Sequence, residues 1–347
     1  MTMSAMIEVD GSHGEGSGQI LRMTVALSAL TGRPVHISNI RAGRSNPGLR
    51  PQHVAAIEAV RRLCSGTVDG LHEHAMEISF HPGTLAGGSH SVDIGTAGSI
   101  TLAMQACLPP MLYASKPSIV RLRGGTDVRW SPPWDYFTRV FLPVLRRVNI
   151  DASATLERRG YYPRGGGEAM LRVQPCSDVR HLSFDHDGDW EIHGRVNIAG
   201  LPGHIARRIR QAARKTLIER GLDADVSIEE CTAASPGVGI VLWTTMPRRL
   251  GADVLGEKGT PAEEVGRKAA EMLLRDIDAG ADLDVHAVDH LIPYMALADG
   301  ATRFRCRELT GHAETELWLL QQFMDISWKK EPRNGCTEVT VSPEETG

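Results

Sequence analysis

The chain has 347 residues, of which 41% are hydrophobic and 23% charged, and its net charge is −4. This composition is ordinary for a globular protein, and the length allows two domains or one large repeated domain with an insertion. No global basic field is present, so nucleic-acid binding would require a local basic surface. Six scattered cysteines without zinc spacing, no signal-peptide pattern and no membrane-length apolar run together predict a cytoplasmic protein with no membrane partner.

The first segments predict a strand, a glycine-rich loop and a helix. A short strand over Met6 to Val9 leads into D-G-S-H-G-E-G-S-G-Q, and an apolar helical pattern follows. Such a loop can cradle phosphate with backbone N–H groups, although its glycine spacing fits neither a Walker loop nor a dinucleotide fingerprint. Glu15 in this loop is a candidate ligand for a metal or a water molecule. The alternative is a solvated loop carboxylate.

The next strand, Val35 to Ile40, ends in an arginine-rich loop. The loop reads R-A-G-R-S-N-P-G-L-R-P-Q-H, and its glycine and proline residues make a poor helix. Arginines in such a loop can bind an anion through charge-assisted hydrogen bonds. A solvated surface loop is the alternative. A helix is predicted from Gln52 to Leu63 and a strand from Ala75 to Phe80.

The same order of elements then recurs, with 84 positions between Asp10 and Ile94. We predict a strand ending at Ile94, the turn G-T-A-G-S, and a helix interrupted by Pro109 and Pro110. A strand, a second helix and two further strands follow, at 118–122, 135–148, 150–156 and 168–173. The recurrence predicts a diverged βαβαββ repeat.

A third repeat is interrupted by an inserted segment. We predict a catalytic domain over 1–183 and 281–347, with repeats at about 6–82 and 89–175 and a third that resumes at 281. Residues 184–280 form a smaller inserted α/β subdomain, which contains a basic amphipathic helix from Ile205 to Arg220. That basic face is a candidate nucleic-acid surface, but a solvated face is the preferred interpretation.

The segment R-E-L-T-G-H-A-E-T-E-L-W predicts a strand running into a helix, with His312 near the helix start. Thr310 or Gly311 can cap this helix. The positive end of the helix dipole disfavours a second positive charge, so a neutral imidazole, which is a competent nucleophile, is expected here. An ordinary capping or packing histidine is the alternative. Pseudo-threefold packing of the repeats would bring the loop of His312 towards the arginine loop and the G-G-T-D loop.

Taken together, these motifs resemble those of the RNA 3′-terminal phosphate cyclase family. The resemblance spans nearly the whole chain through D-G-S-H-G-E-G-S-G-Q-I-L-R, I-R-A-G-R-S-N-P-G-L-R-P-Q-H, R-G-G-T-D, G-Y-Y-P-R-G-G-G, D-H-L-I-P-Y-M-A-L-A and H-A-E-T. It implies three repeats like an initiation-factor C-terminal domain, an inserted subdomain, and ATP-dependent conversion of an RNA 3′-phosphate into a 2′,3′-cyclic phosphate. The implied intermediates are a histidinyl–AMP on the protein and then an adenylylated RNA end, with AMP and pyrophosphate released.

The resemblance also assigns roles to individual residues. His312 matches the nucleophile, and Glu15 matches the carboxylate that helps to hold a divalent cation, Mg²⁺ or Mn²⁺. Asp289 matches an acid beside the nucleophile, and His286 stands where the family often has an aromatic residue that packs on adenine. The residues matched to the ATP and phosphate site are Arg22, Arg41, Arg44, Gln52 and Gln105. RNA with a 3′-phosphate end and ATP are the implied partners, with a homodimer as one candidate assembly.

Two other functions share this type of fold. A cyclase-like factor of ribosome biogenesis would bind without catalysis, but such proteins lack the nucleophile that His312 supplies here. A carboxyvinyl transferase is built from six similar units, whereas this sequence shows three. The sequence therefore favours the cyclase.

Overall fold

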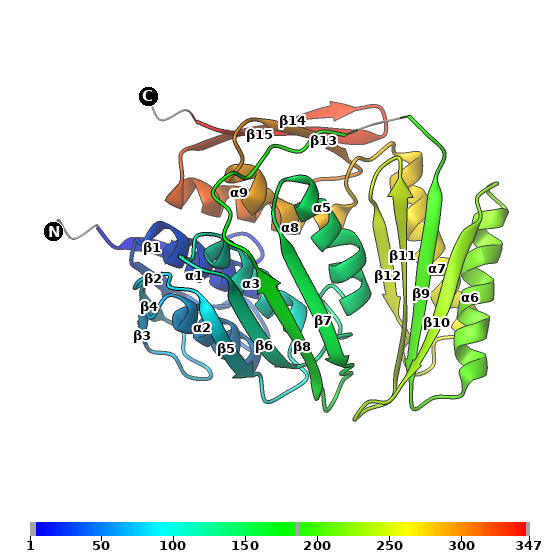
Figure 1. Cartoon of the computed structure of the whole chain (residues 1–347), viewed down its shortest axis with the longest axis horizontal. Helices are drawn as coiled ribbons and strands as arrows, with labels where there is room; N and C mark the ends of the chain where they lie inside the picture. Colours follow the sequence, from blue (N-terminus) through cyan, green and yellow to red (C-terminus); the bar gives the residue numbers. More distant parts are fainter. Residues whose placement is uncertain (1–4, 185–186, 345–347) are drawn as a thin grey trace.

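The computed structural model describes residues 5–184 and 187–344. Three small sheets surround a central group of helices, and a fourth sheet stands beside them with helices of its own (Figure 1). This architecture confirms the predicted mixed α/β class. The termini of the predicted catalytic domain, and residues 185–186 near the predicted start of the insertion, lie outside the described ranges.

The first sheet lies within residues 7–81 and has the order β1-β2-β4-β3. The connection through α1 makes β1 and β2 parallel, as a crossover helix requires. Alternate residues of β1 and β4 are buried because one face of the sheet is covered by helices. The elements are β1 (Ile7–Asp10), α1 (Gly18–Thr31), β2 (Val35–Ser38), α2 (Pro51–Leu63), β3 (Thr67–Asp69) and β4 (Ile78–His81).

The second sheet has the same internal arrangement, β5-β6-β8-β7. Its second helical connection starts as α-helix, passes through one π-helical segment and returns to α-helix. The elements are β5 (Gly88–Asp93), α3 (Ile100–Leu112), β6 (Ser118–Gly124), α4 (Trp134–Tyr136), η1 (Phe137–Phe141), α5 (Leu142–Arg147), β7 (Ala152–Arg158) and β8 (Gly167–Val173). The shared strand order is what a βαβαββ repeat would produce.

The predicted interruption of α3 at Pro109 and Pro110 is wrong. The helix runs without a break from Ile100 to Leu112 and contains both prolines in its last turn. Each proline lacks the N–H of a helical hydrogen bond, but its fixed φ is compatible with a helical backbone. Every residue of α3 is buried, and this packing holds the last turn in place.

The third sheet, β13-β15-β14, has three strands in the described part of the chain. Beside it, residues 179–182 run close to β13: the Asp299 N–H donates to the Val179 carbonyl at 2.8 Å, and the Leu182 N–H donates to Thr302 Oγ1 at 3.1 Å. This segment leads into the fourth sheet. The strands of the third sheet and the two helices connected to them are α8 (Val285–Ala296), β13 (Thr302–Cys306), α9 (Gly311–Phe323), β14 (Ile326–Arg333) and β15 (Cys336–Pro343).

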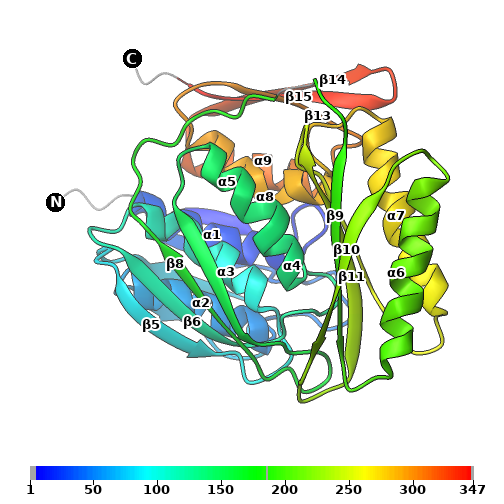
Figure 2. The same ribbon diagram turned by 45° about the vertical axis from the view of Figure 1, so that its right-hand side comes forward.

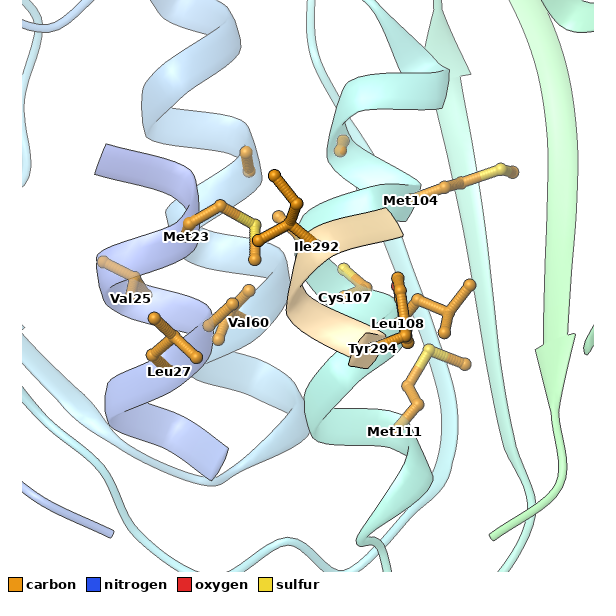
Figure 3. Packing of buried hydrophobic residues seen from close by; sticks show 14 of the residues in the cluster. Met23, Val25, Leu27, Val60, Met104, Cys107, Leu108, Met111, Ile292 and Tyr294 are labelled. Atoms are coloured by element: carbon orange, nitrogen blue, oxygen red, sulfur yellow. The ribbon is translucent and has the colours of Figure 1, made fainter. Parts of the chain in front are cut away.

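Helices of the three sheets meet in one hydrophobic core. Figure 3 shows Met23 and Leu27 on α1 and Met104 and Leu108 on α3, with Ile292 of α8 between the two helices, and all belong to one cluster of buried hydrophobic residues. All five are buried. The core therefore fixes the helix starts relative to each other, although these helices lie far apart in the sequence.

The fourth sheet, β10-β9-β11-β12, has a separate core made of residues 192–281. In Figure 2 its two helices, α6 and α7, cover the face that points away from the other sheets. Its elements are β9 (Glu191–Ala199), α6 (Gly203–Ile218), β10 (Ala224–Cys231), β11 (Gly237–Met246), β12 (Gly251–Leu255) and α7 (Ala262–Asp278). The division at residues 184 and 280 stays a prediction.

A buried polar network joins the fourth sheet to the second. The guanidinium of Arg159 donates to Asp127 at 3.0 and 3.1 Å, to Asp135 at 2.6 Å and to Glu229 of β10 at 2.9 Å. Arg195 of β9 lies 3.3 Å from Asp135 and Glu229. Because these partners come from both sheets, the network fixes how the fourth sheet is placed. Within the described residues, none of the helices combines the length and apolarity needed to cross a bilayer.

Candidate active site

A cleft with a volume of about 890 Å³ opens where the helix starts of the three sheets converge. Loops after β1 and β2, and helices α1, α2, α3, α8 and α9, contribute its walls. All nine predicted site residues line it: Glu15, Arg22, Arg41, Arg44, Gln52, Gln105, His286, Asp289 and His312. The structure therefore brings together side chains that are separated by up to 297 positions, while their individual roles stay predictions.

The loop that carries Glu15 is packed against the start of α9. Gly14 has a φ of +57°, and a Cβ added there would lie 2.3 Å from Thr315 Oγ1, so a side chain is excluded. The ring of His13 stacks on Trp318 of α9, with 3.6 Å between the ring centroids. At its end, Ser17 Oγ accepts from the Gln19 N–H at 3.3 Å and caps α1. These contacts hold Glu15 next to the predicted nucleophile.

His312 occupies the first turn of α9, as predicted. Thr310 is the N-cap residue, and its hydroxyl accepts from the Ala313 N–H at 3.0 Å. His312 Nε2 lies 3.2 Å from Glu15 Oε2, whereas Nδ1 is buried and has no hydrogen-bond partner among the described residues. Nε2 is therefore the ring nitrogen that faces the cleft and can reach a bound phosphorus atom.

The arginine loop is shaped by Arg41. This residue has a left-handed backbone with φ 53°, and its guanidinium donates to the carbonyls of Asn46 and Gly48 at 2.8 and 3.0 Å. Burial, and then the nearby charges of Arg44 and Arg50, lower the pKa of Arg41. Arg44 lies 3.8 Å from Glu15, with 43% of its side chain exposed. Arg41 thus orders the loop, and Arg44 presents its charge beside His312.

Arg22 projects from α1 into the cleft. Burial lowers its pKa to about 10, partly offset by the charge of Glu316 on α9. Among the described residues, no hydrogen bond or ion pair reaches the Arg22 guanidinium. Glu316 is 1% exposed and accepts from Gln19 Nε2 at 3.0 Å, and burial raises its pKa to about 8. Arg22 therefore keeps its hydrogen-bonding capacity for an anion in the cleft.

Helix α8 presents His286 and Asp289 from a start that Asp284 fixes. The Asp284 carboxylate accepts from the backbone N–H groups of His286 and Ala287, from the hydroxyl of Tyr136 and from the N–H of Gly251 on β12. Burial raises the pKa of Asp289 to about 7, and the Thr310 hydroxyl donates to this carboxyl. The cap of α9 is thereby connected to the second turn of α8, with His286 exposed at the rim.

Sequence reasoning missed several residues that line the cleft: His53, His290, Tyr136, Asp253 and Trp130. Burial, followed by nearby positive charges, lowers the pKa of His53 and of His290 to about 3, so both rings are neutral near pH 7. His53 and His290 directly follow Gln52 and Asp289 in the sequence, and this adjacency to two predicted site residues could have identified them. Asp253, whose pKa burial raises to about 7, lies on a strand of the fourth sheet that the sequence did not predict.

The resulting arrangement is a cleft whose arginines can bind an anion beside the imidazole of His312. Arg41 and Arg44 face it from one loop and Arg22 from helix α1, and the neutral rings of His53 and His290 add no competing charge. The described residues contain no group of three or more His, Cys, Asp or Glu side chains that could hold a metal ion by itself. A cation bound by Glu15 would therefore need further oxygen ligands from a ligand or from water, which suits Mg²⁺.

The family profile for RNA 3′-terminal phosphate cyclase matches residues 13–329 of the chain. The chain belongs to this family. The RNA 3′-terminal phosphate cyclase of Pyrococcus furiosus is 45% identical over 320 residues, which cover 92% of this chain and 93% of that protein. That of Methanosarcina mazei is 41% identical, covering 97% of this chain and all of its own, and that of Nitrosospira multiformis is 41% identical, covering 99% and 98%. The predicted family, and with it the assignment to a family of enzymes, is confirmed.

Proposed function

We propose that the protein converts an RNA 3′-terminal phosphate into a 2′,3′-cyclic phosphate at the expense of ATP. The observation that carries the proposal is His312 Nε2 at 3.2 Å from Glu15 in the arginine-lined cleft. The names of the relatives support the same reaction.

In the first proposed step, Nε2 of His312 attacks the α-phosphorus of ATP. The bond from this phosphorus to the bridging oxygen breaks, pyrophosphate leaves, and a phosphoramidate to AMP forms. Arg22 and Arg44 stabilise negative charge that develops on the transferred phosphoryl group. A divalent cation at Glu15 would neutralise phosphate oxygens and hold them in orientation.

In the next two steps, the RNA end replaces the histidine. An oxygen of the RNA 3′-phosphate attacks the same phosphorus, and the phosphorus–nitrogen bond to His312 breaks. The neighbouring 2′-hydroxyl then attacks the RNA phosphate, loses its proton and expels AMP. We assign adenine packing to His286, phosphate or nucleotide contacts to Arg41, Gln52 and Gln105, and ring or AMP orientation to Asp289.

The first step is tested with ATP labelled at its α-phosphorus, magnesium and denaturing electrophoresis. Wild-type protein should keep an acid-labile, alkali-stable label, and His312→Asn should keep none. His204→Asn, which changes an exposed histidine on α6, is the matched control and should label normally. Label on His312→Asn would remove His312 from the mechanism. A wild-type protein that never labels would favour a non-catalytic binding factor.

The later steps are tested with three oligonucleotides. RNA with a 3′-phosphate should cyclise, and RNA with a 3′-hydroxyl should not react. A strand that ends in a 2′-deoxy sugar with a 3′-phosphate should accept AMP and then accumulate, because it lacks the final nucleophile. Release of AMP from this strand without a stalled adenylylated product would contradict the order of steps. Sedimentation of the free protein tests whether the candidate homodimer forms.

A further inference from the structure

Trp130 lines the cleft although 91% of the residue is exposed. It is by far the most exposed large hydrophobic residue in the described part of the chain. A single exposed apolar residue is ordinary on a surface, but an indole ring at the mouth of a polar cleft provides a large apolar face beside a ligand. Trp130 belongs to the loop after β6, which the proposed reaction has not used.

The backbone fixes this exposure. Trp130 has a φ of 60°, a left-handed conformation that is rare for a bulky residue. On one side Arg129 forms an ion pair with Glu257, and on the other the Ser131 hydroxyl donates to the Val128 carbonyl at 2.9 Å. The Thr101 hydroxyl of α3 donates to the Pro132 carbonyl at 2.7 Å. The ring is therefore presented on an ordered loop, which lowers the entropic cost of stacking on a ligand.

The surroundings indicate what the ring would bind. The same cleft exposes Arg44, and a combination of exposed aromatic rings and arginines is typical of sites for single-stranded nucleic acid. Both proposed substrates carry a nucleobase. The adenine of ATP already has a candidate neighbour in His286 on α8. Trp130 comes from a different part of the cleft wall, the loop that follows β6 of the second sheet.

We propose that Trp130 stacks on the nucleobase of the 3′-terminal nucleotide of the RNA. The proposal rests on the proposed function, because it assumes that an RNA end enters the cleft. Every nucleobase has a π-face, so stacking would add affinity without selecting a sequence.

The first test measures binding of a fluorescent RNA with a 3′-phosphate, in the absence of ATP. Trp130→Ala should raise the dissociation constant roughly fivefold to 100-fold, and Trp130→Phe, which keeps an aromatic face, by no more than about threefold. Tyr113→Ala is the matched control, since Tyr113 is 40% exposed but lies at the opposite end of α3, and it should leave binding unchanged.

The second test removes the base instead of the ring. An RNA whose 3′-terminal nucleotide is abasic should bind wild type more weakly, and Trp130→Ala should weaken its binding no further. This non-additivity would identify a direct contact between the ring and the terminal base. Equal losses from Trp130→Ala on normal and abasic RNA would overturn the proposal.

Two further readouts separate the alternatives. If Trp130→Ala raises the KM for ATP in self-labelling while RNA binding stays unchanged, the ring serves adenine and the proposal is wrong. It is equally wrong if the variant changes only the sedimentation of the protein, because the ring then contacts another chain. RNA binding is measured without catalysis, so a failure of His312 labelling would refute the proposed reaction and leave this test intact.

Discussion

Two enclosed arginines, Arg22 and Arg159, show different uses of the same side chain. Arg159 is 2% exposed and is hydrogen-bonded by three carboxylates, whose charges raise its pKa although burial alone would lower it. Burial lowers the pKa of Arg22 in the cleft to about 10, and the Glu316 carboxyl on α9, whose pKa burial raises to about 8, keeps its own proton near pH 7. A fully paired arginine stabilises a junction, whereas an incompletely paired one is available to a phosphate.

The largest effect on folding is expected at Arg159. Arg159→Ala leaves Asp127 and Asp135 buried without their cation and should lower the free energy of unfolding by about 3–5 kcal/mol. Urea denaturation measures this loss. Arg158→Ala is the control: its guanidinium pairs with Glu168 at the surface, and its loss should cost no more than about 0.5 kcal/mol.

If Arg159→Ala does not yield folded protein, Arg159→Lys keeps the charge, loses the fork that reaches several carboxylates, and should show an intermediate loss. Equal stability of the Arg158 and Arg159 variants would show that the network does not hold the junction.

The opposite result is expected for Arg22. Arg22→Ala should slow self-labelling with ATP roughly 10²- to 10³-fold, the usual cost of removing one group that stabilises charge in the transition state. The free energy of unfolding should change by less than about 1 kcal/mol. The variant removes an enclosed charge, but it breaks no hydrogen bond in the described structure. Lysine should restore activity only in part. A variant that unfolds easily and labels normally would make Arg22 a structural residue.

Glu316 is expected to have a smaller effect, on how the free energy of unfolding depends on pH. In the folded protein the Glu316 carboxyl keeps its proton up to about pH 8, whereas in the unfolded chain a glutamate carboxyl releases its proton near pH 4.5. The folded state therefore binds the extra proton between these values, and stability should fall as pH rises, by at most about 1.4 kcal/mol per pH unit. Glu316→Gln should remove this contribution.

Urea denaturation at pH 5.5, 6.5 and 7.5 measures the difference between variant and wild type. The variant should gain relative stability at each step upward in pH. Asp253, whose pKa is also raised and is not shifted by the charge of Glu316, contributes the same slope to both proteins and cancels in the comparison. Parallel pH profiles would show that Glu316 is ionised in the folded state.

The smallest effect is expected on helix α6. Arg208 and Arg214 are paired at the surface with Glu263 and Asp223, so their charges are partly neutralised. Alanine at either position should change RNA binding by less than about twofold and leave the urea midpoint nearly unchanged, because exposed ion pairs contribute little to stability. A marked loss of affinity, together with a shallower salt dependence, would instead place RNA on this helix.

The difference between the two arginines could not be predicted from the sequence. Arg158 and Arg159 are neighbours with similar local surroundings, and only the packing of β10 against the second sheet decides which one is buried. Arg22 was found through the family motif and not through any local pattern. The role of a charged residue therefore depended on contacts between distant segments.

Local signals were more informative for the elements that carry the site. The glycine loop, the arginine loop and the capped start at Thr310 each predicted a turn between a strand and a helix, and each turn reaches the cleft. The prolines of α3 misled the prediction because its interior packing outweighs two lost hydrogen bonds. Asp253 was missed because its strand joins the sheet only through tertiary pairing.

The four hydrogen bonds of Asp284 have a consequence for protein engineering. One carboxylate receives donors from the start of α8, from Tyr136 and from Gly251 of β12, so this cleft-lining helix is oriented partly by a strand that a shortened chain would lack. Excising residues 184–280 to obtain a minimal cyclase would remove a donor from Asp284, a wall from the cleft and Glu229 from Arg159. The fourth sheet thus contributes to the structure of the cleft, and fusion partners or affinity tags should replace none of it.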